Sequence, residues 1–332
     1  MRGRRRGIWK PLGAVCVLLL VLTGGGVWWL TERYAGQVDR LGDVFAAIPE
    51  SGRPAASTAA DGVPVTFLLV GSDSRDVAAD GAAPGARSDA IMLARVAADR
   101  EHAQLISIPR DSWVDIPGHG MNKINASYAF GGPSLLIQTV EQFTGVRIDH
   151  FVAIDFAGLA EVTDALGGVD VYVGQPTQAG GHTFEQGMNH ITGEEARWYL
   201  GQRHGLPGGD FDRVKRQQNF LKAVMDQAVG SQTFSDLGTL DQTLRAVAGS
   251  VAADDDLGVR DMVVLAHSMR NIAKDDVAYF TAPVLGTGRE GAASVVYLDP
   301  AAGDRMWGYL ITDSLGDHAA EFAESALGDA PR

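Results

Sequence analysis

Between Pro64 and about residue 300, short apolar segments rich in β-branched residues alternate with longer segments of helical periodicity. The strand-like segments are VTFLLV, which ends at Val70, AIMLARVA (90–97), AQLISIP (103–109), HFVAIDF (150–156) and VDVYV (169–173). The first two helix-like segments, GGPSLLIQTVEQFTG (131–145) and AGLAEVTDALGG (157–168), end in glycine. This alternation predicts an α/β fold, a three-layer α/β/α sandwich in which helices cover both faces of a mixed central sheet.

Later segments continue the pattern. ITGEEARWYL and DFDRVKRQQNFLKAVMDQAV predict helices, the second of them long and amphipathic. Beyond Gly230 the pattern weakens to two helical segments, LDQTLRAVAG and GVRDMVVLAHSM, and two strands near residues 277–282 and 294–298.

The N-terminus predicts a membrane anchor. Residues 11–30 are uncharged and apolar, which matches the roughly 20 residues that a helix needs to cross a bilayer. Arginines precede this run, so the positive-inside rule keeps residues 1–10 in the cytoplasm as a basic tail. We therefore expect a single-pass protein of the cell membrane, with a juxtamembrane helix and linker at 31–63 and an extracellular domain at 64–330. A cleaved signal peptide is the alternative, although the apolar run exceeds the usual 7 to 15 residues.

Charge and cysteine content narrow the function further. The chain of 332 residues has a formal charge of −13, and because the first ten residues hold five basic side chains, the remainder carries −18. A polyanionic nucleic acid is therefore excluded as a partner of the main domain. The single cysteine, Cys16, lies in the apolar run, so the predicted extracellular domain has no disulfide.

Charged residues gather where the first two predicted strands end. Asp73 and Arg75 follow the first strand, and Arg87 and Asp89 precede the second. Two carboxylates brought together repel each other unless a proton or cation lies between them, and Mg²⁺ is commonly held by one or two carboxylates together with substrate phosphates. The arginines suit an anion bridged to that cation. Simple Arg–Asp ion pairs across the loop are the alternative.

Two further segments carry cations. Arg110 and Asp111 directly follow the third strand, and Lys123 comes a little later. Farther on, Arg203 lies in a Gly/Pro-rich loop before a helix that begins near Asp210. That helix carries three residues on one face, namely Arg213, Arg216 and Gln217. A solvated basic face paired with Asp210 and Asp212 is the alternative for this helix. Because guanidinium binds phosphate bidentately, the combined pattern favours a pyrophosphate and metal site.

Other catalytic signatures are absent from the sequence. It has no P-loop, HExxH, CxxC or G-x-S-x-G pattern, and its eight histidines are scattered without metal-ligand spacing.

Several motifs resemble those of the LytR-CpsA-Psr family. They are, in chain order, FLLVGSDSR, RSDAIMLARV, SIPRDSWVDIPG, KINASYAFGGP, DHFVAIDFAGL, DALGGVDVYV and RHGLPGGDFDRVKRQQ, and they cover roughly residues 64 to 225. The resemblance implies a membrane-anchored phosphotransferase with an α/β/α sandwich. Such an enzyme moves a glycopolymer from a polyprenyl (pyro)phosphate carrier in the membrane lipid to a peptidoglycan sugar hydroxyl and forms a phosphodiester.

The resemblance also implies roles for residues of this chain. It implies that Asp73 and Asp89 bind Mg²⁺ (or Mn²⁺). The pyrophosphate-binding positions that it implies are Arg87, Arg110, Arg203, Arg213 and Gln217, and the charge pattern adds Arg75 and Lys123. The catalytic positions are Asp89, Arg87, Arg110 and Asp111, with Asp111 or Asp89 as the base.

One position departs from the family pattern. Gly201 stands where the family has the first arginine of an R-x-R pair that ends at Arg203, and Arg197 lies four residues earlier, on the preceding predicted helix. Two other functions therefore stay open: a non-catalytic regulator of wall assembly that binds polyprenyl phosphates, and a polyprenyl pyrophosphate hydrolase. We also expect the lipid carrier to enter an apolar tunnel, for which candidate lining residues are Leu135, Val140, Phe143 and Phe220.

Overall fold

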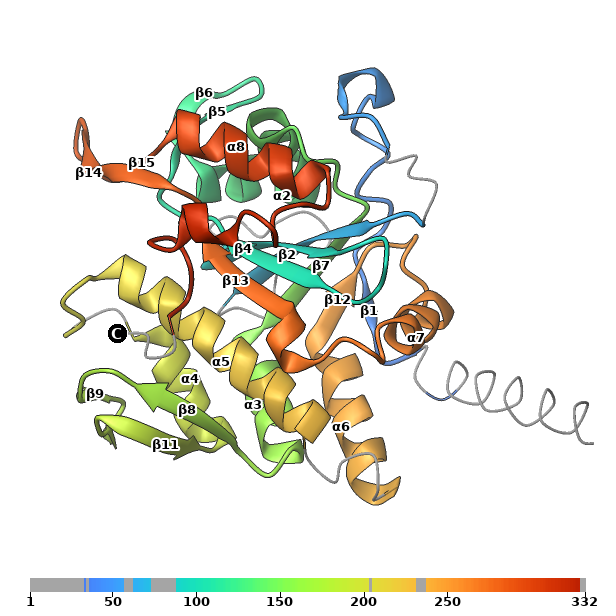
Figure 1. The fold of residues 1–332 in the computed structure, drawn as a ribbon, viewed down its shortest axis with the longest axis vertical. Helices are drawn as coiled ribbons and strands as arrows, with labels where there is room; N and C mark the ends of the chain where they lie inside the picture. Colours follow the sequence, from blue (N-terminus) through green and yellow to red (C-terminus); the bar gives the residue numbers. More distant parts are fainter. Residues whose placement is uncertain are drawn as a thin grey trace, which may run out of the picture.

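The computed structural model describes residue 33 and residues 36–56, 62–72, 88–202, 205–230 and 237–328. Its centre is a seven-stranded sheet with the order β1-β12-β7-β2-β3-β4-β13 (Figure 1). The strands are β1 (Asp39–Arg40), β2 (Val65–Ser72), β3 (Ala90–Val96), β4 (Ala103–Ser107), β7 (His150–Asp155), β12 (Val251–Ala253) and β13 (Val277–Thr281). β2 runs parallel to β7 and antiparallel to β3, while β4 runs parallel to β13. The expected mixed sheet is thus confirmed.

Alternate side chains of the central strands pack on opposite faces, as the pleat requires. Leu68 and Val70 of β2 pack in one core with α2 (Ile124–Thr144) and α8 (Pro300–Ile311). Phe67, beside Leu68 in the chain, packs in another core with α6 (Leu237–Ser250) and α7 (Val259–Ser268). Helices α3 (Phe156–Ala165) and α5 (Asp210–Gly230) lie on the same side of the sheet as α6 (Figure 1). The three layers follow from this division.

Four two-stranded ribbons lie outside the sheet in the described part of the chain. They are β5 (Trp113–Ile116) with β6 (Gly120–Lys123), β8 (Val169–Val173) with β11 (Gly187–Ile191), β9 (Thr177–Ala179) with β10 (His182–Phe184), and β14 (Val284–Glu290) with β15 (Ala293–Leu298). The segment VDVYV is a strand as expected, but among the described residues β8 pairs only with β11. Helix α4 (Gly193–Gly201) follows β11 and begins with a capping box between Thr192 and Glu195.

The segment before the first predicted strand differs from expectation. In place of a juxtamembrane helix and linker, residues 38–53 form part of the domain. Strand β1 pairs in parallel with β12, and the side chains of Val38, Val44 and Ile48 are buried. The described domain therefore begins well before residue 64, because these apolar side chains complete its cores.

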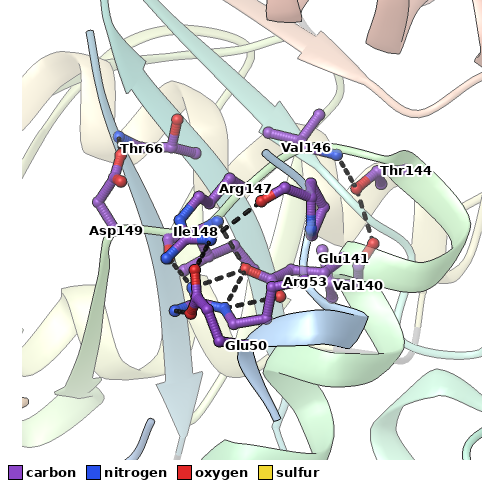
Figure 2. Close-up of polar contacts among 11 residues, drawn as sticks. Glu50, Arg53, Thr66, Val140, Glu141, Thr144, Val146, Arg147, Ile148 and Asp149 are labelled. Carbon is purple, nitrogen blue, oxygen red and sulfur yellow. Dashed lines mark hydrogen bonds and ion pairs between the residues drawn. The ribbon is translucent and has the colours of Figure 1, made fainter. Parts of the chain in front are cut away.

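A buried ion-pair network fixes this N-terminal segment to α2 (Figure 2). Arg53 Nη2 lies 2.8 Å from Glu141 Oε1, and both side chains are more than 90% buried. Arg53 also donates to the carbonyl of Ile148, whose own N–H donates to Glu141. At the exposed side, Arg147 lies 2.7 Å from Glu50. The segment is thereby held by charge-assisted hydrogen bonds as well as by apolar packing.

The predicted membrane anchor, residues 11–30, lies outside the described residues, which exclude 1–32. Within the residues that are described, no helix is long and apolar enough to cross a bilayer.

Candidate functional site

The ends of several central strands meet at one edge of the sheet. β2 and β4 both run antiparallel to β3, so the C-terminal ends of β2 and β4 lie beside the N-terminal end of β3. Asp89 stands at that end of β3, and its N–H donates to the carbonyl of Gly71 at 2.8 Å. Arg110 comes three residues after β4. The sheet topology therefore brings two predicted site residues to the same edge.

Helix α5 adds its first turns to this edge. Gly209, immediately before the helix, has φ +58°, a left-handed conformation that glycine adopts without a steric cost. Gln218, two turns into the helix, donates to Ser107 Oγ at 2.8 Å and to the carbonyl of Phe280, at the ends of β4 and β13. This buried amide fixes the helix across the sheet edge, with Arg213 near Asp89.

Four charged side chains then form one cluster. Arg110 pairs with Asp89, and its Nε lies 3.6 Å from Asp210 Oδ1. Arg213 Nη2 lies 2.6 Å from the same Asp210 oxygen, while its Nη1 lies 3.9 Å from Asp89 Oδ1. Asp89 is 5% exposed and Arg213 only 1%. Two carboxylates and two guanidinium groups from three distant segments are thus largely removed from water.

Several buried polar atoms in or beside this cluster have no hydrogen-bond partner within the described residues. They include Ser88 Oγ, Arg110 Nε, Asp210 Oδ2 and Gln217 Nε2. Ser88 adjoins Asp89 in the chain, and Gln217 lies one helical turn after Arg213. Buried polar groups are nearly always satisfied in folded proteins, so unpaired donors and acceptors together indicate a place for a polar ligand.

The acidic residues present fit a metal ion only in part. Within the described residues, no group of three or more His, Cys, Asp and Glu side chains is placed to hold an ion. Asp89 and Asp210 share two arginine partners, however, and Asp210 Oδ2 is an unpaired buried oxygen. Mg²⁺ takes hard oxygen ligands and commonly needs only one or two carboxylates when substrate phosphates supply others. The donor set therefore fits an ion that binds together with a phosphate.

Two further predicted residues, Asp111 and Lys123, form an ion pair, and Asp111 directly follows Arg110 of the cluster in the chain. Lys123 Nζ lies 3.1 Å from Asp111 Oδ1, and both side chains are partly exposed. The backbone around them is held on both sides: the carbonyl of Asp111 accepts from Val296 N–H at 2.9 Å, and that of Arg110 accepts from Asn125 N–H. Asp111 is thereby fixed next to Arg110 while keeping access to solvent.

The remaining predicted residues of the charged loops cannot be placed. Asp73, Arg75, Arg87 and Arg203 lie in residues 73–87 and 203–204, outside the described part of the chain.

Arg216 contacts different groups from Arg213, although both lie on helix α5. Its guanidinium donates to Gln202 Oε1 at 2.6 Å and to Thr177 Oγ1 at 2.8 Å, and it lies over the ring of Tyr199. Burial lowers the pKa of Arg216 from its usual value. Arg216 therefore connects α5 to the loop after α4 and to β9.

The loop after α4 and strand β9 border a cavity of about 610 Å³. Both Arg197 and Gly201 line it, together with Gln202 and the aromatic side chains of Phe156 and Trp198. A Cβ atom at Gly201 would meet nothing within 4 Å, so open space remains where an arginine would stand. Arg197, one helical turn earlier, lies on the same side of α4.

The four residues suggested for a lipid tunnel do not line one cavity. Val140 is fully buried in the core between α2 and the sheet, with Leu135 and Phe143 packed against that core. Phe220 is fully buried in a separate core among α3, α4, α5 and β8. The tunnel hypothesis is wrong for Val140 and Phe220, because their apolar surfaces are fully used in packing; Leu135 and Phe143 are partly buried, and Phe143 lines a separate cavity.

Asp210 is the site residue that sequence reasoning missed. The helical spacing suggests it only as an ion-pair partner for a solvated helix face, yet it bridges the buried Arg213 and the partly buried Arg110. Its position at the start of α5, behind a glycine pair, was the available signal.

Comparisons to known proteins agree with the fold. The LytR-CpsA-Psr family model matches residues 46–308. A polyisoprenyl-teichoic acid–peptidoglycan teichoic acid transferase, TagU of Enterococcus faecalis, is 31% identical over 262 residues, which cover 78% of this chain and 82% of that protein. Among solved structures, TagV of Bacillus subtilis superposes with a TM-score of 0.63 at 24% identity and covers 76% of this chain and 97% of TagV. TagT bound to LI-WTA gives a TM-score of 0.58 at 24% identity, covering 76% of this chain and 91% of TagT. This chain belongs to the LytR-CpsA-Psr family.

Proposed function

We propose that this protein moves a glycopolymer from a polyprenyl (pyro)phosphate carrier to a peptidoglycan sugar hydroxyl and forms a phosphodiester. The observation that carries the proposal is the buried cluster of Asp89, Arg110, Asp210 and Arg213, assembled from three distant segments at one edge of the sheet. The names of relatives support the substrates: TagU is called a transferase of polyisoprenyl-linked teichoic acid to peptidoglycan, and TagT has been solved with LI-WTA bound.

The arginines account for most of the chemistry in this proposal. Phosphoryl transfer relies on positioning and on charge stabilisation rather than on covalent catalysis by the protein. Arg110 and Arg213 would bind the pyrophosphate oxygens and stabilise the negative charge that grows on the leaving polyprenyl phosphate. Gln217, whose amide nitrogen is buried without a partner in the described chain, would donate another hydrogen bond. Because Arg213 is desolvated, its attraction for the phosphate is stronger than it would be in water.

The acceptor hydroxyl would attack the phosphorus that carries the glycopolymer. The new bond joins the acceptor oxygen to that phosphorus, the bond to the bridging pyrophosphate oxygen breaks, and polyprenyl phosphate leaves. The hydroxyl proton would pass to a carboxylate. Asp111 is the better placed of the two candidates, because it is partly exposed, whereas Asp89 is buried between two arginines.

Asp89 and Asp210 would hold Mg²⁺ or Mn²⁺, joined by Asp73 if the family pattern applies. Such an ion would neutralise phosphate charge as a Lewis acid. In the same proposal residues 11–30 anchor the protein in the cell membrane, the N-terminus stays cytoplasmic, and the domain faces the cell wall, where both substrates meet.

A reconstituted reaction tests the proposal. The purified full chain in detergent is incubated with a lipid pyrophosphate-linked oligosaccharide, with and without a peptidoglycan fragment as acceptor. We expect a phosphodiester-linked product only when the acceptor is present, and loss of that product after EDTA with recovery on adding Mg²⁺. Release of phosphate regardless of acceptor would instead identify a hydrolase. Binding of the donor without turnover would identify a non-catalytic regulator.

A further inference from the structure

A second cavity, of about 340 Å³, lies on the α2 side of the sheet, opposite α4 and α5 (Figure 1). The ribbon of β5 and β6, the strand β15 and the helices α2 and α8 meet there. Four large aromatic side chains from these elements line it, namely Trp113 of β5, Phe143 of α2, Tyr297 of β15 and Trp307 of α8. We call it the aromatic cavity. Its volume suits one long side chain of a ligand rather than a whole substrate.

The rings of the aromatic cavity are held in place by their neighbours. Phe143 and Trp307 meet edge to face, with ring centroids 6.2 Å apart. The hydroxyl of Tyr297 donates to Glu290 Oε1 at 2.8 Å across the ribbon of β14 and β15. A Cβ on Gly288 would lie 2.5 Å from the tyrosine ring, so that ring packs directly on the glycine backbone. The aromatic wall is therefore formed in advance, and little order has to be gained when a ligand binds.

Every charged side chain among the described residues that line the aromatic cavity is acidic. The three carboxylates belong to Asp115, Asp299 and Asp304. Asp299 caps α8 by accepting from the N–H of Ala302 at 3.0 Å, and Asp115 accepts from Gln142. Asp304 is exposed on α8, and its side chain makes no hydrogen bond or ion pair to a residue that the structure describes. Negative charge thus stands beside the aromatic wall.

Two cations lie close in the chain to these lining residues, and both are paired elsewhere. Lys123 Nζ lies 3.1 Å from Asp111 Oδ1. Arg305 Nε lies 3.7 Å from Glu321 Oε2. The faces of aromatic rings attract cations through the ring quadrupole, and this attraction is strongest where the cation leaves water. Aromatic rings with carboxylates beside them therefore suit an ammonium group supplied by a ligand.

The aromatic cavity adjoins Asp111, the better placed base of the proposed reaction. Trp113 comes two residues after Asp111, so at most about 7 Å separates their Cα atoms. From the other side, the N–H of Val296 donates to the carbonyl of Asp111 at 2.9 Å, and Tyr297 directly follows Val296. A group bound in the cavity therefore lies near the place where the acceptor hydroxyl would lose its proton. This position favours the acceptor over the lipid-linked donor as the source of the ligand.

We propose that the aromatic cavity binds an ammonium group of the peptide part of the peptidoglycan acceptor. Peptidoglycan carries short peptides on its sugars, and a diamino acid in such a peptide presents an alkylammonium group on a flexible chain. The aromatic rings contact this group, and Asp304 pairs with it. The inference rests on the proposed function and adds an acceptor class to it: the protein prefers acceptors whose peptide amine is positively charged.

Three acceptors that differ only at the peptide amine test the preference. One peptidoglycan fragment carries a lysine with a free amine. The second carries dimethyl-lysine, which keeps the charge and adds bulk, and the third carries acetyl-lysine, which is neutral. With the full chain in detergent, we expect acetylation to lower kcat/KM for the acceptor roughly tenfold, as for the loss of a desolvated cation–aromatic contact, and dimethylation to change it by less than about twofold.

Two variants locate the preference in the aromatic cavity. Asp304→Asn and Trp113→Leu should each bring the preference for the free amine over the acetylated amine below about threefold. Asp304 is exposed, so its variant keeps the fold, and circular dichroism melting checks the fold of Trp113→Leu. The matched control is Asp275→Asn, which removes an exposed aspartate of the short helix before β13 and should keep the tenfold preference.

The outcomes separate the inference from the proposed function. Equal rates of the wild type with free and acetylated amines would overturn the inference, and so would a tenfold preference that persists in both variants. A loss on dimethylation as large as that on acetylation would also overturn it, because charge would then not be what is recognised. If the wild type transfers to none of the three acceptors, the proposed function fails, and calorimetric titration with an alanyl-glutamyl-lysine peptide and its acetyl-lysine form decides the inference. Tighter binding of the free amine that is lost in Trp113→Leu supports it, and equal binding of the two peptides refutes it.

Discussion

Replacing Arg110 tests the charged cluster most directly. Its guanidinium contacts both Asp89 and Asp210, so it joins the β4 loop to the strand β3 and to the helix α5. Its side chain is 14% exposed, against 2% for Arg213, so a truncated variant leaves a gap that water can reach. Arg110→Ala removes the charge, while Arg110→Lys keeps the charge and removes the planar group that reaches two carboxylates.

The size of the expected effect follows from the hydrogen bond that each variant removes. One charge-assisted hydrogen bond contributes about 1.5–3 kcal/mol, so Arg110→Ala should lower kcat/KM by roughly 10- to 150-fold if Arg110 binds a phosphate oxygen. The kcat/KM of Arg110→Lys should lie between that of Arg110→Ala and that of the wild type. The fold should survive, because Arg213 still faces both carboxylates, at 2.6 Å from Asp210 and 3.9 Å from Asp89.

The assay compares three variants under one set of conditions. Rates of product formation from a lipid pyrophosphate-linked oligosaccharide and a peptidoglycan fragment give kcat and KM, and circular dichroism melting reports folding. The control is Arg305→Ala, because Arg305 is 54% exposed on α8 and its only ion pair in the described chain, to Glu321, measures 3.7 Å. Such a surface pair is worth at most about 1 kcal/mol. Wild-type kcat/KM in a folded Arg110→Ala variant would refute the role of this cluster in phosphate binding.

Two further predictions concern stability. Arg53→Ala should lower the free energy of unfolding in urea by roughly 3–5 kcal/mol, because it leaves Glu141 charged and buried. The control is Lys222→Ala, which breaks a solvent-accessible i,i+4 pair with Asp226 and should lower the free energy of unfolding by no more than about 0.5 kcal/mol. Similar losses in the two variants would contradict this expectation. Burial raises the pKa of Tyr128 to about 12 from a usual value of 10, so the folded state holds this proton more tightly and stability should fall as pH rises from 10 to 12. In thermal melts between pH 10 and 12, Tyr128→Phe should lose less stability with rising pH than the wild type. An equal loss in both proteins would contradict the role of Tyr128.

The sequence predicted the sheet well where strands carry buried faces on both sides. VTFLLV, AIMLARVA and AQLISIP became β2, β3 and β4, because near-continuous apolar runs indicate strands covered by two layers. The glycine stop at Gly145 is also confirmed, with φ +67° at the C-cap of α2. Among the ribbons, β8 and β15 match predicted strands, whereas the ribbon of β9 and β10 was not predicted. β9 and β10 have only three residues each, so they are too short to show a periodic pattern.

The site was predicted in its residue types more than in its pairings. Asp89, Arg110 and Arg213 were all expected, and the structure brings them together. The helical spacing placed Arg216 beside Arg213, but the two side chains contact different groups. Arg213 pairs with Asp210, whereas Arg216 donates to Gln202. Asp210 was missed as a site residue because an acidic residue one turn before an arginine is equally explained by a solvated ion pair on the helix surface. Only tertiary structure shows that it reaches Arg110.

The paired charges also explain how a deeply buried arginine can serve a polyanionic substrate. Arg213 is 1% exposed, and an isolated guanidinium there would be strongly destabilised by the loss of its hydration. Asp210 at 2.6 Å and Asp89 at 3.9 Å offset that loss while the site is without substrate. A phosphate must therefore compete with carboxylates for the same guanidinium, so a ligand with a single negative charge gains little by replacing them. A pyrophosphate presents several oxygens to Arg110 and Arg213 at once, and its binding leaves both carboxylates free to hold a cation. Pairing arginines with aspartates thus favours multiply charged phosphates that bind together with a metal over simple anions.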